Sequence, residues 1–276
     1  METMSGTVTS DDGTTITFLE YGTGPGLVIV PGNNRRAHHY ATLAGLLAGS
    51  YRVTVIDRRG RGRSGPQGAD YSVDREAEDV QAVLAARGAT FLFGHSYGGL
   101  IALHAALLKP PAALAVFDPG VSIDGSFPSG WLPRFTALLD RGRHHAAMAL
   151  FLRESRLSPL GDAPRPVFWA LAFLLLHGSD GPDTKAMMAT TPREVGEVVR
   201  LDSDGSRYAA VTCPALLLGG GRTPSYLRDV LPRLAQLMPG SWCEIIDGLD
   251  HNAPDLNAPE EIAGRLAALM RRTSSV

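Results

Sequence analysis

Residues 90–99 read TFLFGHSYGG. The first four form an apolar run that predicts a short buried strand, and the apolar stretch 100–108 that follows predicts a helix. Between the two lies the pattern G-x-S-x-G, centred on Ser96. A turn this tight brings positions 94 and 98 against the crossing backbone, so both must be glycine. The setting favours a nucleophile elbow, which holds the Ser96 hydroxyl at the end of a sheet, over a tight turn without chemistry.

Strands and helices alternate on both sides of this turn. Apolar or alternating runs predict strands, which occupy residues 7–9, 14–21, 27–30, 52–56, 90–93, 113–117, 215–218 and 242–246. Helical spacing predicts helices, which occupy residues 39–47, 72–86, 100–108, 225–237 and 259–270. Such alternation is typical of an α/β fold. We expect a mostly parallel eight-stranded sheet that is opened by an antiparallel hairpin and covered by helices on both faces.

The alternation stops between residues 120 and 211. Pro- and Gly-rich joints separate helical segments there, which lie near residues 131–140, 143–155, 166–177 and 184–200. We therefore expect a core of residues 1–119 and 212–276, with residues 120–211 inserted as a helical cap after the strand that ends at Asp118. The run 167–176 is apolar on all sides, so it must be buried or face an apolar cavity. Packing of cap against core accounts for most such side chains, but a hydrophobic pocket is also expected, lined by Trp131, Phe135, Phe168, Trp169 and Phe173.

Composition excludes several classes of function. The 276 residues carry a net charge of −2, which gives no reason to expect nucleic acid or an anionic membrane as a partner. The longest apolar run has ten residues, too short for a membrane span. Residues 1–10 lack the basic and apolar regions of a secretion signal, so we expect a cytoplasmic protein. Cys213 and Cys243 lack the spacing of metal ligands, and no metal is expected. The oligomeric state stays open, with a homodimer among the alternatives.

The loop 57–64, DRRGRGRS, carries two patterns that we do not assign to a ligand. With Gly65, its glycines match the spacing of a dinucleotide fingerprint, but Pro66 intervenes and the next helix starts only near residue 72. No cofactor is therefore expected. The four arginines lack interleaved aromatic residues, and we expect them to form a solvated or salt-bridged loop.

The chain resembles the α/β-hydrolase family in the order of its elements, the loop 57–64, the elbow 94–99 and the late pair Asp250-His251. The resemblance covers the chain except the cap. It implies a serine hydrolase that cleaves a hydrophobic carboxylic ester or lactone through an acyl-enzyme on Ser96. A serine nucleophile argues against epoxide hydrolase and dehalogenase chemistry, which in this fold use an aspartate. A ligand-binding or receptor-like member with slow turnover, and a cofactor-free haloperoxidase or C–C hydrolase, remain alternatives.

The resemblance also implies a base and an acid for Ser96. A serine hydroxyl needs a neighbouring base at pH 7, and the family places it late in the chain. His251 alone among eight histidines follows the last strand. The acid often follows the strand at 215–218, but the loop 219–224 reads GGGRTP and has no carboxylate. Asp118 ends the strand after the elbow, where some relatives, such as haloalkane dehalogenases and zearalenone-type lactone hydrolases, carry their acid. It is the preferred candidate, and the alternatives are Asp229, Asp247 and Asp250.

Two backbone N–H groups are expected to hold the oxyanion that develops during acyl transfer. In this family one belongs to the residue after the nucleophile, here Tyr97, and the other to the loop after the third strand. That loop usually begins His-Gly; here it reads Pro31-Gly32-Asn33-Asn34, so Asn33 matches the donor by position. Asn33 and Asn34 are equally compatible with a role as turn formers.

Overall fold

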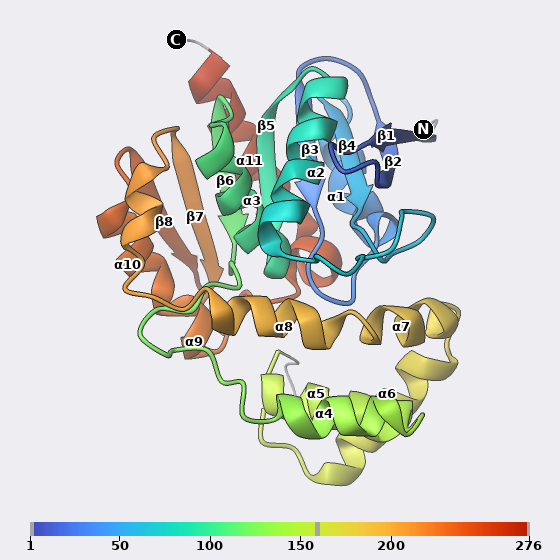
Figure 1. The fold of residues 1–276 in the computed structure, drawn as a ribbon. Helices are drawn as coiled ribbons and strands as arrows, with labels where there is room; N and C mark the ends of the chain where they lie inside the picture. The colour runs from blue at the N-terminus through green and yellow to red at the C-terminus, as the bar shows by residue number, and fades with distance from the viewer. Residues whose placement is uncertain (1–2, 158–160, 275–276) are drawn as a thin grey trace.

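In the computed structural model, which describes residues 3–157 and 161–274, eight strands form one sheet (Figure 1). The strands are β1 (Thr3–Thr9), β2 (Thr15–Tyr21), β3 (Gly26–Val30), β4 (Arg52–Asp57), β5 (Ala89–His95), β6 (Ala113–Phe117), β7 (Ala215–Gly220) and β8 (Ser241–Ile246). Their order is β1-β2-β4-β3-β5-β6-β7-β8. Strand β2 is antiparallel to β1 and β4, and the pairs from β4 to β8 are parallel. The predicted α/β fold with a mostly parallel sheet is confirmed.

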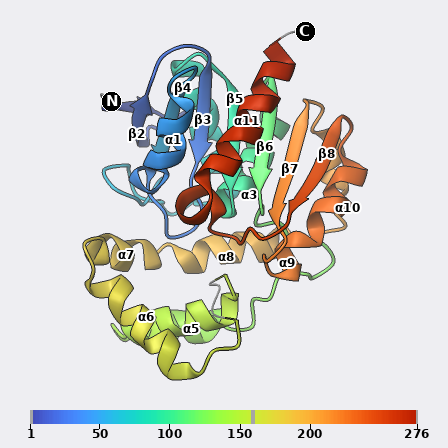
Figure 2. The ribbon, with the colours of Figure 1, turned by 180° about the vertical axis from the view of Figure 1, so that it is seen from behind.

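Helices cover both faces of the sheet, as Figures 1 and 2 show from opposite sides. One face carries α2 (Val73–Ala86), α3 (Tyr97–Leu108) and α10 (Val230–Leu237), and the other carries α1 (Ala41–Leu47) and α11 (Pro259–Ser274). Strand β3 shows how the two cores form. Val28 and Val30 pack in the core under α2 and α3, whereas Leu27 and Ile29 pack under α1 and α11. Successive residues of a strand point to opposite faces, so a strand between two helical layers must be apolar throughout.

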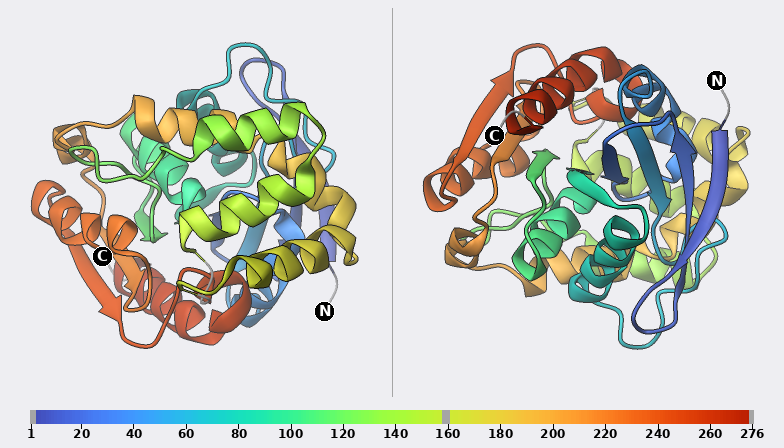
Figure 3. Two further views of the ribbon diagram at one scale, coloured as in Figure 1. Left: turned by 90° about the horizontal axis from the view of Figure 1, so that it is seen from below. Right: turned by 90° about the horizontal axis from the view of Figure 1, so that it is seen from above.

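Between β6 and β7 the chain forms a helical layer of its own. Its helices are α4 (Leu132–Asp140), α5 (His144–Ser155), α6 (Arg165–His177), α7 (Gly181–Met188) and α8 (Thr191–Arg200). Helix α8 crosses the edge where the parallel strands end, and α4, α5 and α6 lie beyond it (Figures 1 and 3). The single helical segment expected near 184–200 is instead α7 and α8. The break precedes Pro192, which fits the first turn of a new helix and not a helix interior.

The layer between β6 and β7 has an apolar core of its own. Phe135, Met148, Phe168 and Leu176 are among its buried members. A short helix, α9 (Ser225–Arg228), follows β7. Within the described part of the chain, no helix combines the length and apolarity that crossing a membrane would require.

Candidate active site

Ser96 sits at the junction of β5 and α3 with φ 57° and ψ −125°. A positive φ is uncommon for a residue with a side chain, and here the surroundings enforce it. A Cβ at Gly94 would collide with the Gly98 backbone, and a Cβ at Gly98 with the backbone of Val30. The Ser96 N–H donates to the carbonyl of Phe117 on the neighbouring strand (2.9 Å). The strand, the helix and the two glycines therefore fix the serine at the end of the sheet, as the elbow pattern predicts.

His251 and Asp118 come together beside this turn. Nδ1 of His251 lies 3.1 Å from Oδ2 of Asp118, and both side chains are buried. A carboxylate can only accept, so Nδ1 carries the proton and the Nε2 lone pair stays free. Thr223 donates its hydroxyl hydrogen to the same Asp118 oxygen (2.6 Å). The loop that lacks a carboxylate thus contributes a hydrogen bond to the carboxylate on the adjacent strand.

Two of the three other carboxylates considered for this role have different partners. Asp229 pairs with Arg228 (3.0 Å), and Asp250 accepts from the N–H of Asn252 (2.8 Å) and from the side chain of Asn257. Among the residues that the structure describes, Asp118 is the carboxylate that hydrogen bonds to His251. The geometry therefore favours Asp118 over its alternatives.

His95, to which the sequence analysis assigned no role, supports the backbone of His251. Its Nε2 lies 2.8 Å from the His251 carbonyl oxygen, and its Nδ1 lies 2.7 Å from the Tyr40 hydroxyl. The carbonyl can only accept, so Nε2 carries the proton and the Tyr40 hydroxyl donates to Nδ1. The Gly32 N–H in turn donates to that hydroxyl (3.2 Å). Burial lowers the pKa of His95 to about 3, so the ring is neutral at pH 7.

The two residues expected to hold an oxyanion, Asn33 and Tyr97, flank Ser96. Neither of their backbone N–H groups donates to another residue in the described part of the chain. Tyr97 is the first residue of α3, where an N–H has no partner within the helix. The Asn33 side chain is engaged elsewhere, since its Nδ2 donates to Glu194 on α8 (2.7 Å). Two free N–H donors beside a serine can stabilise a negative oxygen there.

Glu194 belongs to a buried ionic network under this loop. Arg58 donates to Glu194 (2.9 Å), to Glu76 (2.8 Å) and to the carbonyl of Gly32 (3.3 Å), and Arg61 also pairs with Glu194. Burial would raise the pKa of the Glu194 carboxyl, but the two guanidinium groups lower it below its usual value of 4.5, so the group is charged at pH 7. The network ties helix α8 to the loop that carries Asn33.

The arginines of loop 57–64 are therefore buried more than a solvated loop would allow. Arg58 and Arg61 are fully covered, and Arg59 makes two hydrogen bonds of 2.7 Å to Asp79. Arg63 alone of the four is exposed. The prediction of a salt-bridged loop is confirmed. The prediction of a solvated loop is wrong for Arg58, Arg59 and Arg61. Carboxylates on α2 and α8 pair with these guanidinium groups and offset the free-energy cost of burying their charge.

A cavity of about 450 Å³ lies over the strand ends and contains Ser96 and His251 in its wall. Its outer wall is mostly aliphatic and is formed by Met148, Leu152, Leu157, Leu171, Leu174, Leu175 and Leu256. Arg35, His39 and Asp180 lie at its polar side. The arrangement offers a nucleophile, a base and a largely apolar space for a substrate.

The aromatic residues expected in the pocket lie elsewhere, with one exception. Trp131 lines a smaller compartment beside Ser96. Phe135 and Phe168 are buried in the core between the helices of the β6–β7 segment. Trp169 and Phe173 do not line the cavity that contains Ser96, and their side chains on α6 are 44% and 51% exposed. A uniformly apolar helix does not reveal which of its faces will be covered.

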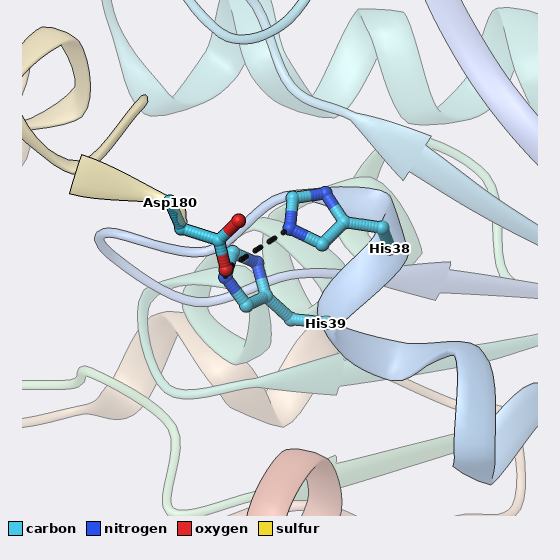
Figure 4. A group of neighbouring side chains, drawn as sticks. All are labelled: His38, His39 and Asp180. Carbon is cyan, nitrogen blue, oxygen red and sulfur yellow. Dashed lines mark ion pairs between the residues drawn. The ribbon is translucent and has the colours of Figure 1, made fainter. Parts of the chain in front are cut away.

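His38, His39 and Asp180 lie close together near the cavity, and their side chains are of the types that bind metal ions (Figure 4). Nε2 of His38 and Nε2 of His39 each lie 3.7 Å from Oδ2 of Asp180. However, Nδ1 of His39 accepts from the N–H of Arg36 (2.9 Å), which places the ring proton on Nε2, facing Asp180. A nitrogen that carries a proton has no lone pair for a metal. The tautomer of His39 therefore argues against a metal centre. It favours a direct contact between His39 of the core and Asp180 of the β6–β7 segment.

Known proteins are similar in sequence and fold over most of the chain. A family model described as "Alpha/beta hydrolase family" matches residues 27–265. N-formylmaleamate deformylase of Pseudomonas putida is 36% identical over 251 residues, which cover 86% of each chain. A solved α/β hydrolase of Sphaerobacter thermophilus is 31% identical with a TM-score of 0.79, covering 96% of this chain and 100% of the other. Est816, solved as an N-acyl homoserine lactone degrading enzyme, has 24% identity, a TM-score of 0.74 and coverage of 95% and 99%, and shows a shared fold.

Proposed function

The chain belongs to the alpha/beta hydrolase family, and we propose that it is a serine hydrolase that cleaves a small apolar carboxylic ester or lactone through an acyl-enzyme on Ser96. The observation that carries the proposal is the hydrogen bond between Asp118 and His251, at the wall of the cavity that contains Ser96. The mostly aliphatic wall supports an apolar substrate. In this proposal, residues 1–119 and 212–276 act as the core and residues 120–211 as the cap.

The reaction proceeds in two stages. In the first, the Ser96 oxygen bonds to the substrate carbonyl carbon while Nε2 of His251 takes the hydroxyl proton. The N–H groups of Asn33 and Tyr97 donate to the resulting oxyanion. The bond to the leaving group then breaks, and His251 returns the proton to it. In the second stage, His251 takes a proton from water, the water oxygen attacks the acyl-enzyme, and the acid product leaves as Ser96 regains its proton.

Asp118 orients this base and stabilises its charged form. Its hydrogen bond fixes the tautomer in which Nε2 faces the reaction, and its negative charge favours the imidazolium that forms when the serine loses its proton. The Thr223 hydroxyl holds the carboxylate in place. His95 holds the backbone of His251 from the opposite side and, being neutral, adds no charge that would oppose the imidazolium.

A second candidate is hydrolysis of an N-acyl bond. The relative from Pseudomonas putida, similar over most of both chains, is named for removing a formyl group from nitrogen. The same two stages apply, except that His251 protonates a departing nitrogen. The same test of Ser96 as nucleophile therefore applies whether the substrate is an ester, a lactone or an N-acyl compound. Which of these the protein turns over distinguishes the two candidates.

Replacement of the nucleophile tests the proposal. We expect Ser96→Ala and His251→Ala each to lower kcat for p-nitrophenyl acetate by roughly 10³-fold or more, with an unchanged circular dichroism spectrum. A fluorophosphonate reagent should label the wild-type protein and Ser50→Ala, which changes an exposed serine, but not Ser96→Ala. Turnover that persists in Ser96→Ala contradicts the proposal. An unlabelled wild type without turnover would favour the receptor-like alternative.

A further inference from the structure

Ser96 lies between two compartments of very different size. The larger is the cavity of about 450 Å³ described above, and the smaller holds about 40 Å³. Both have Asn33, Ser96 and Phe151 in their walls, so they meet at the nucleophile. An acyl substrate has two parts, one on each side of the carbonyl carbon. The two compartments can therefore receive one part each.

The walls of the small compartment are mostly apolar, although Asn33 and Glu194 contribute to them, and hydrogen bonds hold its large side chains in place. The ring of Phe127 packs edge-on against Tyr226 (centroids 5.2 Å apart), and the Tyr226 hydroxyl donates to the carbonyl of Ser155 (2.6 Å). The Trp131 indole N–H donates to the carbonyl of Pro128 (2.9 Å). These hydrogen bonds hold the large side chains in single orientations, because breaking one would leave a buried polar group without a partner. The compartment therefore resists expansion to fit a longer chain.

The position of the base decides which part of the substrate enters which compartment. The leaving group must accept a proton from Nε2 of His251, so it has to lie on the histidine side of the serine. Among the described residues, His251 lines the large compartment and is not in the wall of the small one. The leaving group therefore belongs in the large compartment. The acyl chain points the other way, past Tyr97 and into the small one.

We propose that this protein is selective for short acyl groups attached to bulky apolar leaving groups. The inference rests on the proposed function. The small compartment offers about 40 Å³ and the large one about 450 Å³, so the acyl group has roughly a tenth of the room that the leaving group has. A short acyl chain such as acetyl or propionyl therefore fits the small compartment better than a phenyl ring does. The large compartment imposes no such limit on the alcohol or amine.

A pair of isomeric esters tests the assignment directly. Benzyl acetate and methyl phenylacetate contain the same atoms, and both release a simple primary alcohol, but the phenyl ring lies on opposite sides of the carbonyl. We expect kcat/KM for benzyl acetate to exceed that for methyl phenylacetate by roughly 10²-fold, since even one excess methylene in a tight pocket costs about 10- to 200-fold. Equal rates, or a preference for methyl phenylacetate, overturn the inference when both reactions require Ser96. If neither ester is hydrolysed in a Ser96-dependent reaction, the proposed function has failed and the inference falls with it.

Two variants of the small compartment sharpen the result. Phe127→Ala removes a half-buried loop residue from its wall and should raise kcat/KM for p-nitrophenyl hexanoate relative to acetate by about 10-fold. Val198→Leu adds a methylene to the wall and should lower the rate for propionate more than for acetate. Leu174→Ala, at the outer wall of the large compartment, serves as the matched control and should leave the acyl-length profile unchanged. A profile that shifts in the control but not in Phe127→Ala contradicts the assignment.

Discussion

Helices α6 and α8 belong to the same layer over the sheet, yet they use opposite chemistry. Helix α6 is almost entirely apolar, and it leaves Trp169, Phe173 and Leu174 between 44% and 65% exposed. Helix α8 is more polar, and it buries Glu194 completely. The difference shows that the polarity of a side chain does not by itself determine whether it is buried in this layer. The presence of an interaction partner also decides it. A carboxylate becomes buried here because guanidinium groups lie opposite it.

The partners of α8 come from the core, whereas those of α6 come from its own layer. Arg58 and Arg61, on the loop after β4, meet Glu194 of α8. The buried stripe of α6, Phe168, Ala172 and Leu176, packs against other helices of the β6–β7 segment. We infer that α8 determines how this layer sits on the oxyanion loop, and that α6 mainly supplies the distant wall of the cavity.

The largest effect that this comparison predicts is that of Glu194→Gln. The substitution keeps the shape of the side chain but leaves Arg61 without a carboxylate among the described residues and Arg58 with Glu76 alone. Removing one partner from a buried ion pair typically costs about 3–5 kcal/mol, so we expect the free energy of unfolding to fall by about 3 kcal/mol or more. Urea denaturation with an unchanged m-value would measure it.

The same variant should also lower catalysis in the folded protein. Glu194 accepts from the Asn33 side chain and anchors Arg58, which donates to the carbonyl of Gly32, so the substitution weakens two supports of the oxyanion loop at once. We expect kcat to fall by roughly 10-fold or more at a temperature where the variant is folded, with little change in KM. Wild-type stability and wild-type kcat in Glu194→Gln would show that α8 does not position the loop.

A smaller effect is expected for Glu197→Gln, the matched substitution one turn along α8. Glu197 accepts from the N–H of Val73 at the start of α2 (2.9 Å) and pairs with Arg200. Its charged partner, Arg200, has a side chain that is 53% exposed, so we expect a loss of about 1–2 kcal/mol in the free energy of unfolding and an unchanged kcat. Equal losses of unfolding free energy and kcat in Glu197→Gln and Glu194→Gln would contradict the idea that the burial of charge distinguishes the two positions.

The contribution of Glu197 should also disappear in acid. Burial opposes ionisation of this carboxyl, but hydrogen bonds from Arg200 and from the N–H of Val73 lower its pKa below the usual 4.5. A carboxyl with a lowered pKa in the folded state stabilises the protein above the unfolded-state pKa and loses that contribution as the pH falls through the folded-state value. The stability difference between wild type and Glu197→Gln should therefore be constant from pH 5 to 7 and shrink below pH 4.5. A difference as large at pH 3 as at pH 7 would contradict this origin.

The sequence could predict what depends on neighbours along the chain. The elbow around Ser96 is a strand, a glycine turn and a helix within about twenty residues, and local periodicity reveals all three. Asp118 and His251 follow strand ends, so the parallel sheet brings them to one edge. The contact between Arg58 and Glu194 joins residues 136 positions apart, and no spacing rule connects them. The hydrogen bond from His95 to the backbone of His251 likewise joins residues 156 positions apart.

The smallest effect is expected on α6, at a residue that the sequence placed in the pocket. Phe173 is 51% exposed and stacks on His177 (centroids 4.2 Å apart), so Phe173→Ala should change the free energy of unfolding by no more than about 0.5 kcal/mol and leave kcat/KM unchanged. Phe168→Ala makes the same substitution on the buried stripe of the same helix, where about 3–5 kcal/mol is expected. Thermal and urea unfolding of the two variants side by side would measure the contrast. Comparable losses of unfolding free energy at both positions would mean that another molecule covers Phe173 in solution. The contrast between α6 and α8 would then hold for a single chain but not for the protein in solution.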